Sequence, residues 1–198
     1  MSVIIELQAA DALLIVDVQM DFLPGGTLAV PRGNEVIAPL NQYIHVFMEN
    51  NLPIYASRDW HPKTHCSFSD QNGIWPPHCI QNSYGAEFSK SLNLPIQTII
   101  ISKAMSPGQD AYSAFDGTQL NDLCRHSGTK RLFIGGLATE YCVLSTVEEA
   151  LKYGFDVCVL SDAIRAINIE QHDGEKAIGK MKAAGAVIIT LSDMVTLA

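Results

Sequence analysis

The chain has 198 residues, 47% of them hydrophobic and 17% charged, with a formal net charge of -8 at pH 7. This length predicts one domain, residues 1–198, and the composition excludes a disordered or tail-like protein. The acidic balance argues against a nucleic-acid or membrane-surface partner, because such surfaces are usually approached through clustered Lys and Arg.

Short aliphatic or β-branched runs alternate with amphipathic segments along the chain. The runs are typical of buried parallel strands and lie at residues 12–18, 53–57, 98–102, 131–134, 156–160 and 186–190. The amphipathic segments are typical of helices and lie at residues 35–51, about 119–127, 140–153 and 169–184. This alternation favours right-handed crossovers. We therefore predict a single-domain three-layer α/β/α sandwich with a mostly parallel, doubly wound six-stranded sheet.

The five cysteines include no C-x-x-C pair, and their odd number argues against a disulfide framework. Cys124 and Cys158 lie in apolar periodic stretches and are expected to be small buried core residues. The N-terminus lacks the pattern of a cleaved leader, and no apolar run approaches the roughly 18 residues that span a bilayer. We therefore expect free thiols and a cytoplasmic protein.

Polar residues lie at or just after the carboxyl ends of four of the predicted strands. They are Asp17, the pair Asp59 and His61, Lys103, and the segment 135–142. In open α/β sheets ligands bind outside the carboxyl ends of the strands, so these residues are expected to face one cleft. No G-x-G-x-x-G pattern follows the first strand, which argues against dinucleotide binding.

The segment Gly135-Gly-Leu-Ala-Thr-Glu-Tyr-Cys142-Val predicts a strand, a tight glycine turn and a helix. Thr139 is a candidate N-cap that would place Cys142 in the first helical turn. Backbone N–H groups and the helix dipole there would lower the thiol pKa and make Cys142 a nucleophile. Taken alone, Cys142 could equally be an ordinary small core residue.

A cysteine nucleophile needs a group that accepts its proton and later delivers one to the leaving amine. No spare histidine stands at a strand end for this task, but Asp17 can perform it. The cation of Lys103 could hold both the carboxylate and the thiolate in place. Singly, Asp17 could be a satisfied strand-end carboxylate and Lys103 a surface residue, but their joint occurrence at strand ends favours catalysis.

Residues 58–88 form a long segment without clear periodicity, which suggests a functional loop. It contains the candidate metal ligands Asp59, His61, His65 and His78. A carboxylate and imidazoles suit zinc, iron(II) or manganese, with positions left open for water or substrate. A lone histidine here would more simply be a polar loop residue, but the clustering favours a metal site.

These motifs resemble those of the isochorismatase-like cysteine hydrolases and, among them, the nicotinamidases. The matching pieces occur in the expected order over most of the chain: Ile15-Val-Asp-Val-Gln-Met-Asp-Phe22, Arg58-Asp-Trp-His-Pro-Lys-Thr-His65, Trp75-Pro-Pro-His-Cys79, Lys103, Asp110-Ala-Tyr-Ser-Ala-Phe115 and Gly136-Leu-Ala-Thr-Glu-Tyr-Cys-Val143. Met20 departs from the common Asn, and Ala104 departs from the frequent Gly. Neither position has a proposed chemical role.

The resemblance implies roles for individual residues. Asp17, Lys103 and Cys142 would form the catalytic triad; Asp59, His61 and His78 would bind the metal; Ala138 and Cys142 would form the oxyanion hole; and Phe22, Trp75 and Tyr112 would line the ring pocket. The resemblance also implies a cis peptide between Ala138 and Thr139. His65 stays off the ligand set, because its role differs among relatives.

The implied reaction is hydrolysis of nicotinamide, a small-molecule partner, to nicotinate and ammonia, a step of NAD salvage, with pyrazinamide as a further substrate. Zinc is the favoured cofactor, and iron or manganese are alternatives. A hydrolase of another small amide or of a vinyl ether is a second hypothesis, although such relatives generally lack this metal set. A third is a non-catalytic metal-binding or redox-sensing module. The sequence leaves the native metal and assembly into a homo-oligomer undecided.

Overall fold

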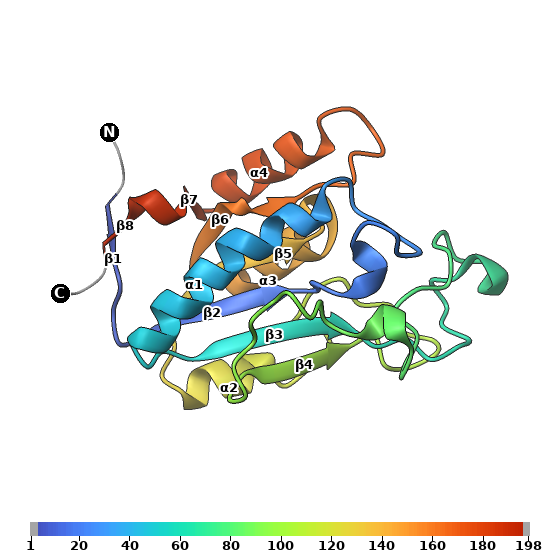
Figure 1. The fold of residues 1–198 in the computed structure, drawn as a ribbon, viewed down its shortest axis with the longest axis horizontal. Coiled ribbons are helices and arrows are strands. Elements are labelled where there is room, and N and C mark those ends of the chain that lie inside the picture. Colours follow the sequence, from blue (N-terminus) through green and yellow to red (C-terminus); the bar gives the residue numbers. More distant parts are fainter. Residues whose placement is uncertain (1–3, 196–198) are drawn as a thin grey trace.

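The computed structural model describes residues 4–195 and contains a six-stranded sheet between two layers of helices (Figure 1). The outermost residues of the predicted domain lie outside this range. The strands of the large sheet are β2 (Asp11–Val16), β3 (Ile54–Asp59), β4 (Ile99–Lys103), β5 (Arg131–Leu137), β6 (Asp156–Arg165) and β7 (Val187–Ile189). Two short strands, β1 (Ile5–Glu6) and β8 (Met194–Val195), pair separately.

The large sheet is parallel throughout, with the strand order β4-β3-β2-β5-β6-β7. The chain winds from β2 outward to β4 and then returns to the other side of β2 for β5, β6 and β7. The predicted doubly wound α/β/α class is therefore confirmed. In this order the direction of winding changes between β2 and β5, and ligands bind at such a point.

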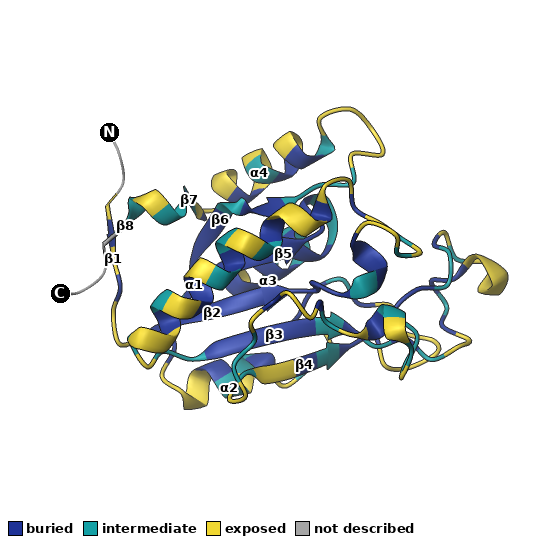
Figure 2. Cartoon of the chain, in the orientation of Figure 1, coloured by how far each residue is buried: buried dark blue, intermediate teal, exposed yellow. Residues whose placement is uncertain are grey.

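Four α-helices cover the sheet: α1 (Ile37–Glu49), α2 (Leu120–His126), α3 (Leu144–Lys152) and α4 (Asp173–Ala183). Alternate residues of a strand point to opposite faces. On β2, Leu13 and Ile15 pack in the core formed with α1, whereas Leu14 packs in the core formed with α2, α3 and α4. The sheet is accordingly buried on both faces while the outer sides of the helices are exposed (Figure 2).

The element boundaries differ from the predicted ones at strand ends and at helix starts: β5 and β6 extend beyond residues 134 and 160 to Leu137 and Arg165. The predicted helix at 140–153 begins as a five-residue π-helical turn, Thr139–Val143, before α3. The predicted helix at 169–184 begins only at Asp173. Cys124 and Cys158 are buried, as expected, and all five cysteines are free.

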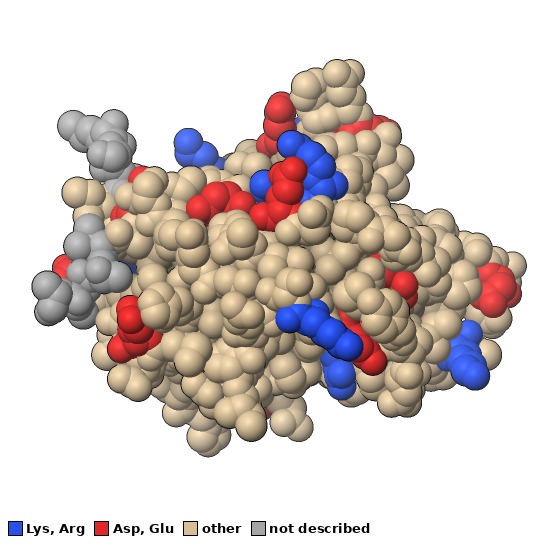
Figure 3. Space-filling model, in the orientation of Figure 1, with Lys and Arg blue, Asp and Glu red and all other residues tan. Residues whose placement is uncertain are grey.

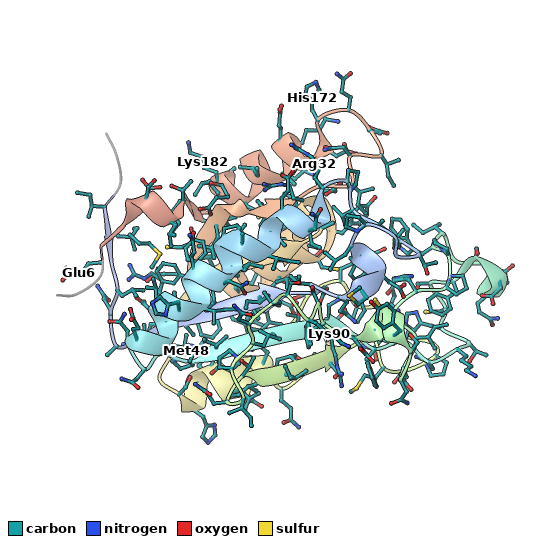
Figure 4. All side chains as sticks on the ribbon, viewed as in Figure 1. Glu6, Arg32, Met48, Lys90, His172 and Lys182 are labelled. Atoms are coloured by element: carbon teal, nitrogen blue, oxygen red, sulfur yellow. The ribbon has the colours of Figure 1, made fainter. Side chains whose placement is uncertain are left out.

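Charged side chains are interspersed on the face shown in Figure 3, where Lys and Arg form no continuous patch. Side chains fill the space between α1 and the sheet, whereas Met48 at the end of α1 is 43% exposed (Figure 4). Within residues 4–195, no helix has the length and apolar character needed to cross a membrane.

Candidate active site and metal centre

The polar residues predicted at strand ends meet at one edge of the sheet. Asp17 directly follows β2, Asp59 and Lys103 end β3 and β4 as register partners, and Cys142 lies in the turn after β5. All four are buried, with Asp17 and Lys103 at most 1% exposed. Parallel strands bring their carboxyl ends to one side, so residues far apart in sequence converge here.

Lys103 stands at the centre of this group. Its Nζ lies 3.0 Å from Oδ2 of Asp17 and 3.5 Å from Sγ of Cys142, donates to the carbonyl of Ala111 at 3.1 Å, and forms an ion pair with Asp59. Burial alone would lower the pKa of Lys103, but the charges of Asp17 and Asp59 outweigh burial and raise this pKa well above its usual value. The lysine is therefore a fixed cation between the two carboxylates.

The pKa of the Cys142 thiol is shifted in the opposite direction to the one expected from the sequence. Burial raises the pKa of Cys142 well above its ordinary value, and the charge of Lys103 opposes this only in part. The expected lowering at a helix start is therefore wrong for this environment, because desolvation of a thiolate dominates. Burial also raises the pKa of Asp17, which makes its carboxylate a stronger base than an exposed one.

Asp59, His61 and His78 offer ligand atoms that all lie within 4.8 Å of one another. Nε2 of His61 and Nε2 of His78 each lie 3.9 Å from an oxygen of Asp59. The opposite ring nitrogens lie beside backbone carbonyls: Nδ1 of His61 is 3.1 Å from the oxygen of His78, and Nδ1 of His78 is 2.7 Å from that of Pro76. Since a carbonyl only accepts, each Nδ1 carries the proton and each Nε2 lone pair is free for a metal.

The protonation states also fit a metal site. Burial lowers the pKa of His61 to about 4, so its ring is neutral at pH 7. Burial alone would raise the pKa of Asp59, but the charge of Lys103 and its hydrogen bond to the carboxylate bring this pKa below its usual value. Neutral imidazoles and an ionised carboxylate are the forms in which these groups coordinate a divalent cation.

The ring of His65 packs against that of His61, with centroids 4.2 Å apart and planes tilted by 34°, but both of its ring nitrogens have other partners. Its Nε2 lies 3.0 Å from the carbonyl oxygen of Gln109, and its Nδ1 lies 2.7 Å from Oγ of Ser67. His65 can also be grouped with His61 and Asp110 by distance. The hydrogen bonds nevertheless direct its lone pair away from the Asp59 cluster.

One cavity adjoins both the Cys142 thiol and the three candidate metal ligands, Asp59, His61 and His78. It has an empty volume of about 440 Å³, part of it open to solvent, and is lined by Phe22, Leu28, Asp59, His61, Ser67, Trp75, His78, Asp110, Ala111, Tyr112, Ala138, Tyr141, Cys142 and Ile167. The three predicted ring-pocket residues are all among these. Nε1 of Trp75 donates to the hydroxyl of Tyr112 at 2.9 Å, which fixes two of the aromatic walls against each other.

The protein matches the isochorismatase domain model over residues 11–193. The chain belongs to the isochorismatase family. It is 38% identical to the nicotinamidase of Escherichia coli over 92% of this chain and 95% of that protein. Its structure is similar to that of the pyrazinamidase of Pyrococcus horikoshii in complex with zinc, with a TM-score of 0.89 and 47% identity over 92% of this chain and 99% of that one. It is also similar to PnC1 of L. infantum in complex with nicotinate, with a TM-score of 0.88 and 34% identity over 98% and 99% of the two chains.

Several residues around the cavity of this isochorismatase-family protein were not predicted from the sequence. Tyr141 packs edge-on against Trp75, with ring centroids 5.2 Å apart, and its place beside Cys142 was an available signal. Leu28 and Ile167 line the cavity from segments without a recognisable pattern. Gln19, completely buried, donates through Nε2 to the carbonyl of Asp59 and accepts from the N–H of Asp59, both at 2.8 Å.

The turn before Cys142 differs in two details from the expectation. The cis peptide lies between Leu137 and Ala138, one residue earlier than the family resemblance suggested. The residue at the N-cap is Ala138, whose carbonyl accepts from the N–H groups of Tyr141 and Val143. The hydroxyl of Thr139, the predicted N-cap, has no hydrogen-bond partner among the described residues. Cys142 still lies in the first turn.

Gly136 is required by this turn, and its replacement should be strongly destabilising. Its φ is +131°, and a Cβ there would lie 2.0 Å from the carbonyl oxygen of Val16. We expect Gly136→Ala to lower the free energy of unfolding by about 2–4 kcal/mol, because both the backbone conformation and the contact with β2 are forbidden. Urea unfolding measures this loss.

The matched control is Gly179→Ala, on α4, where nothing lies within 4 Å of the added methyl group. Alanine has the higher helix propensity, so this variant should gain about 1 kcal/mol. A Gly136→Ala protein as stable as wild type would contradict the account of the turn.

Proposed function

We propose that the chain is a cysteine amidohydrolase that converts nicotinamide to nicotinate and ammonia, and that it also accepts pyrazinamide. One observation supports this most strongly: a single cavity between aromatic walls presents the Cys142 thiol together with the free Nε2 atoms of His61 and His78. Such a cavity can hold a flat ring at the metal cluster and the ring's carboxamide at the thiol. The nicotinamidase and pyrazinamidase relatives agree with this substrate class.

The first half of the reaction uses the triad. Asp17 takes the proton of the Cys142 thiol, and the sulfur attacks the carboxamide carbon. The backbone N–H groups of Ala138 and Cys142 hold the resulting oxyanion, each such donor being worth roughly 3–4 kcal/mol. Lys103 stabilises the negative charge of both Asp17 and the sulfur, since its Nζ is close to each. The proton on Asp17 then passes to the nitrogen that leaves as ammonia.

In the second half, water attacks the thioester carbon and Asp17 again accepts a proton. The C–S bond breaks, nicotinate forms, and the thiol regains its proton from Asp17. Nicotinate, which is bound in the L. infantum protein, is the product of this reaction and agrees with the proposed substrate class. Phe22, Trp75 and Tyr112, which line the cavity, would form the walls of the ring pocket.

Asp59, His61 and His78 would hold a divalent metal ion, for which zinc is our first choice because the P. horikoshii structure contains it. Iron and manganese suit the same ligands. The bound metal would supply a Lewis-acid contact for the ring nitrogen of the substrate. This contact would orient the carboxamide over Cys142, and such orientation would lower the barrier by removing freedom of motion beforehand.

The substrate range tests this proposal. We expect ammonia release from nicotinamide and pyrazinamide, and at least about 100-fold lower kcat/KM for benzamide, which has the same shape but lacks the ring nitrogen. A coupled ammonia assay measures all three. Hydrolysis of benzamide as fast as nicotinamide would contradict the role of the ring nitrogen, and activity on other amides without any on nicotinamide would contradict the substrate.

A further inference from the structure

Ser57 on β3 contacts Asp17 in two ways. Its backbone carbonyl accepts a hydrogen bond from the N–H of Asp17 at 3.2 Å, and its hydroxyl donates to Oδ1 of Asp17 at 2.7 Å. Both residues are completely buried, so water cannot replace the hydroxyl. A single serine therefore holds the main chain and the carboxylate of the proposed catalytic base.

The two oxygens of the Asp17 carboxylate have different surroundings. Oδ1 accepts the hydroxyl of Ser57. Oδ2 lies 3.0 Å from Nζ of Lys103 but has no partner with hydrogen-bond geometry among the described residues. Nζ of Lys103 also lies 3.5 Å from Sγ of Cys142, so Oδ2 and the thiol are both neighbours of this cation, and a carboxylate oxygen of Asp17 lies within 4.8 Å of Sγ. Oδ2 is free to accept a proton.

We infer that Ser57 is a positioning residue, whose hydroxyl holds Oδ1 so that Oδ2 receives the proton of Cys142. The S–H bond breaks, an O–H bond forms at Oδ2, and the electron pair left on sulfur attacks the carboxamide carbon. Without the hydroxyl, the carboxylate turns about its Cβ–Cγ bond to find another donor, and Oδ2 loses its alignment. The inference rests on the proposed function only in taking Asp17 as the base.

Ser57 does not line the cavity, so its loss should affect turnover rather than binding. For Ser57→Ala we expect kcat for nicotinamide to fall about 10- to 100-fold, part of the effect of a general base, while KM stays within about twofold. Ser57→Thr keeps the hydroxyl on a residue that strands favour and should restore most of kcat. The matched control is Ser161→Ala on β6, where the lost hydroxyl donates to the carbonyl of Ile189 and activity should be unchanged.

A second measurement needs no substrate. The rate at which iodoacetamide alkylates Cys142, followed by peptide mass spectrometry, reports how readily the thiol gives up its proton. Ser57→Ala should slow this alkylation severalfold in the wild-type background. It should cause no further slowing in Asp17→Asn, because Ser57 acts only through the carboxylate.

The two measurements separate this inference from the proposed function, since alkylation is informative even if nicotinamide is not hydrolysed. A Ser57→Ala protein with wild-type kcat and alkylation rate would overturn the inference. Equal slowing of alkylation by Ser57→Ala in the wild-type and Asp17→Asn backgrounds would also overturn it, because that result indicates a general structural effect.

Discussion

The Cys142→Ala variant should lose nearly all ammonia release from nicotinamide, with kcat reduced roughly 10⁴- to 10⁶-fold, as when the nucleophile of a hydrolase is removed. Cys142 is the sulfur that lines the cavity, and its Sγ lies 3.5 Å from Nζ of Lys103. Removing it leaves the base and the cation without a nucleophile to activate. Steady-state ammonia assays at high enzyme concentration measure the residual rate.

Two further measurements show whether this loss is chemical. The variant should still bind nicotinate, which calorimetry detects, because the metal ligands and the aromatic walls are intact. Cys66→Ala is the matched control, since Cys66 is a partly exposed free cysteine that is not among the cavity residues, and its activity should stay near wild type. Retention of full activity by Cys142→Ala would contradict the role of Cys142 as nucleophile, whereas absence of amide hydrolysis by the wild-type protein would favour the non-catalytic, redox-sensing hypothesis.

The His78→Ala variant is expected to lose both its divalent metal and its activity on nicotinamide. His78 presents Nε2 to Asp59 while its Nδ1 is held by the carbonyl of Pro76, so its replacement removes one of the three candidate ligands. Loss of one of three protein ligands should weaken zinc binding by at least about 100-fold, more than the loss of a residue that merely supports a ligand. Chelator competition and elemental analysis measure metal affinity and content.

His45→Ala provides the control for histidine removal, because His45 is exposed on α1, where it contacts Glu49. Its metal content and activity should equal those of wild type. Wild-type protein stripped by a chelator should lose activity and regain it with zinc, iron(II) or manganese, and the ion that restores most activity identifies the preferred metal. Undiminished activity after complete metal removal would contradict the assigned role.

Two features of the site argue against the competing hypotheses. A hydrolase of a vinyl ether has no need of a metal cluster beside the thiol, whereas here Lys103 contacts both Asp17 and Asp59 and so connects the thiol to the cluster. A structural metal site would normally have four protein ligands. The Asp59, His61 and His78 group has three and borders a cavity, which favours an ion with positions open to substrate.

Much of the fold follows from local patterns that the sequence displays directly. Aliphatic runs such as 131–134 and 156–160 are too short for buried helices but fit buried strands. The amphipathic segments between them cover the sheet through right-handed crossovers. Once the strands are parallel, residues that follow them must gather at one edge. Asp17, Asp59, Lys103 and Cys142 could therefore be placed together before any coordinates.

Only the tertiary structure decided how these groups interact. Whether the pKa of Cys142 is raised or lowered depends on burial of the thiol. This burial comes from segments elsewhere in the chain that pack over it. The same holds for His65, which lies in the same short segment as Asp59 and His61 but has its ring nitrogens beside Gln109 and Ser67. Ser57 gave no signal, because a serine inside a strand acquires a role only from the neighbour that its hydroxyl reaches. Spacing and residue type thus determined which groups could meet, whereas desolvation and side-chain orientation, both products of packing, decided what each group does.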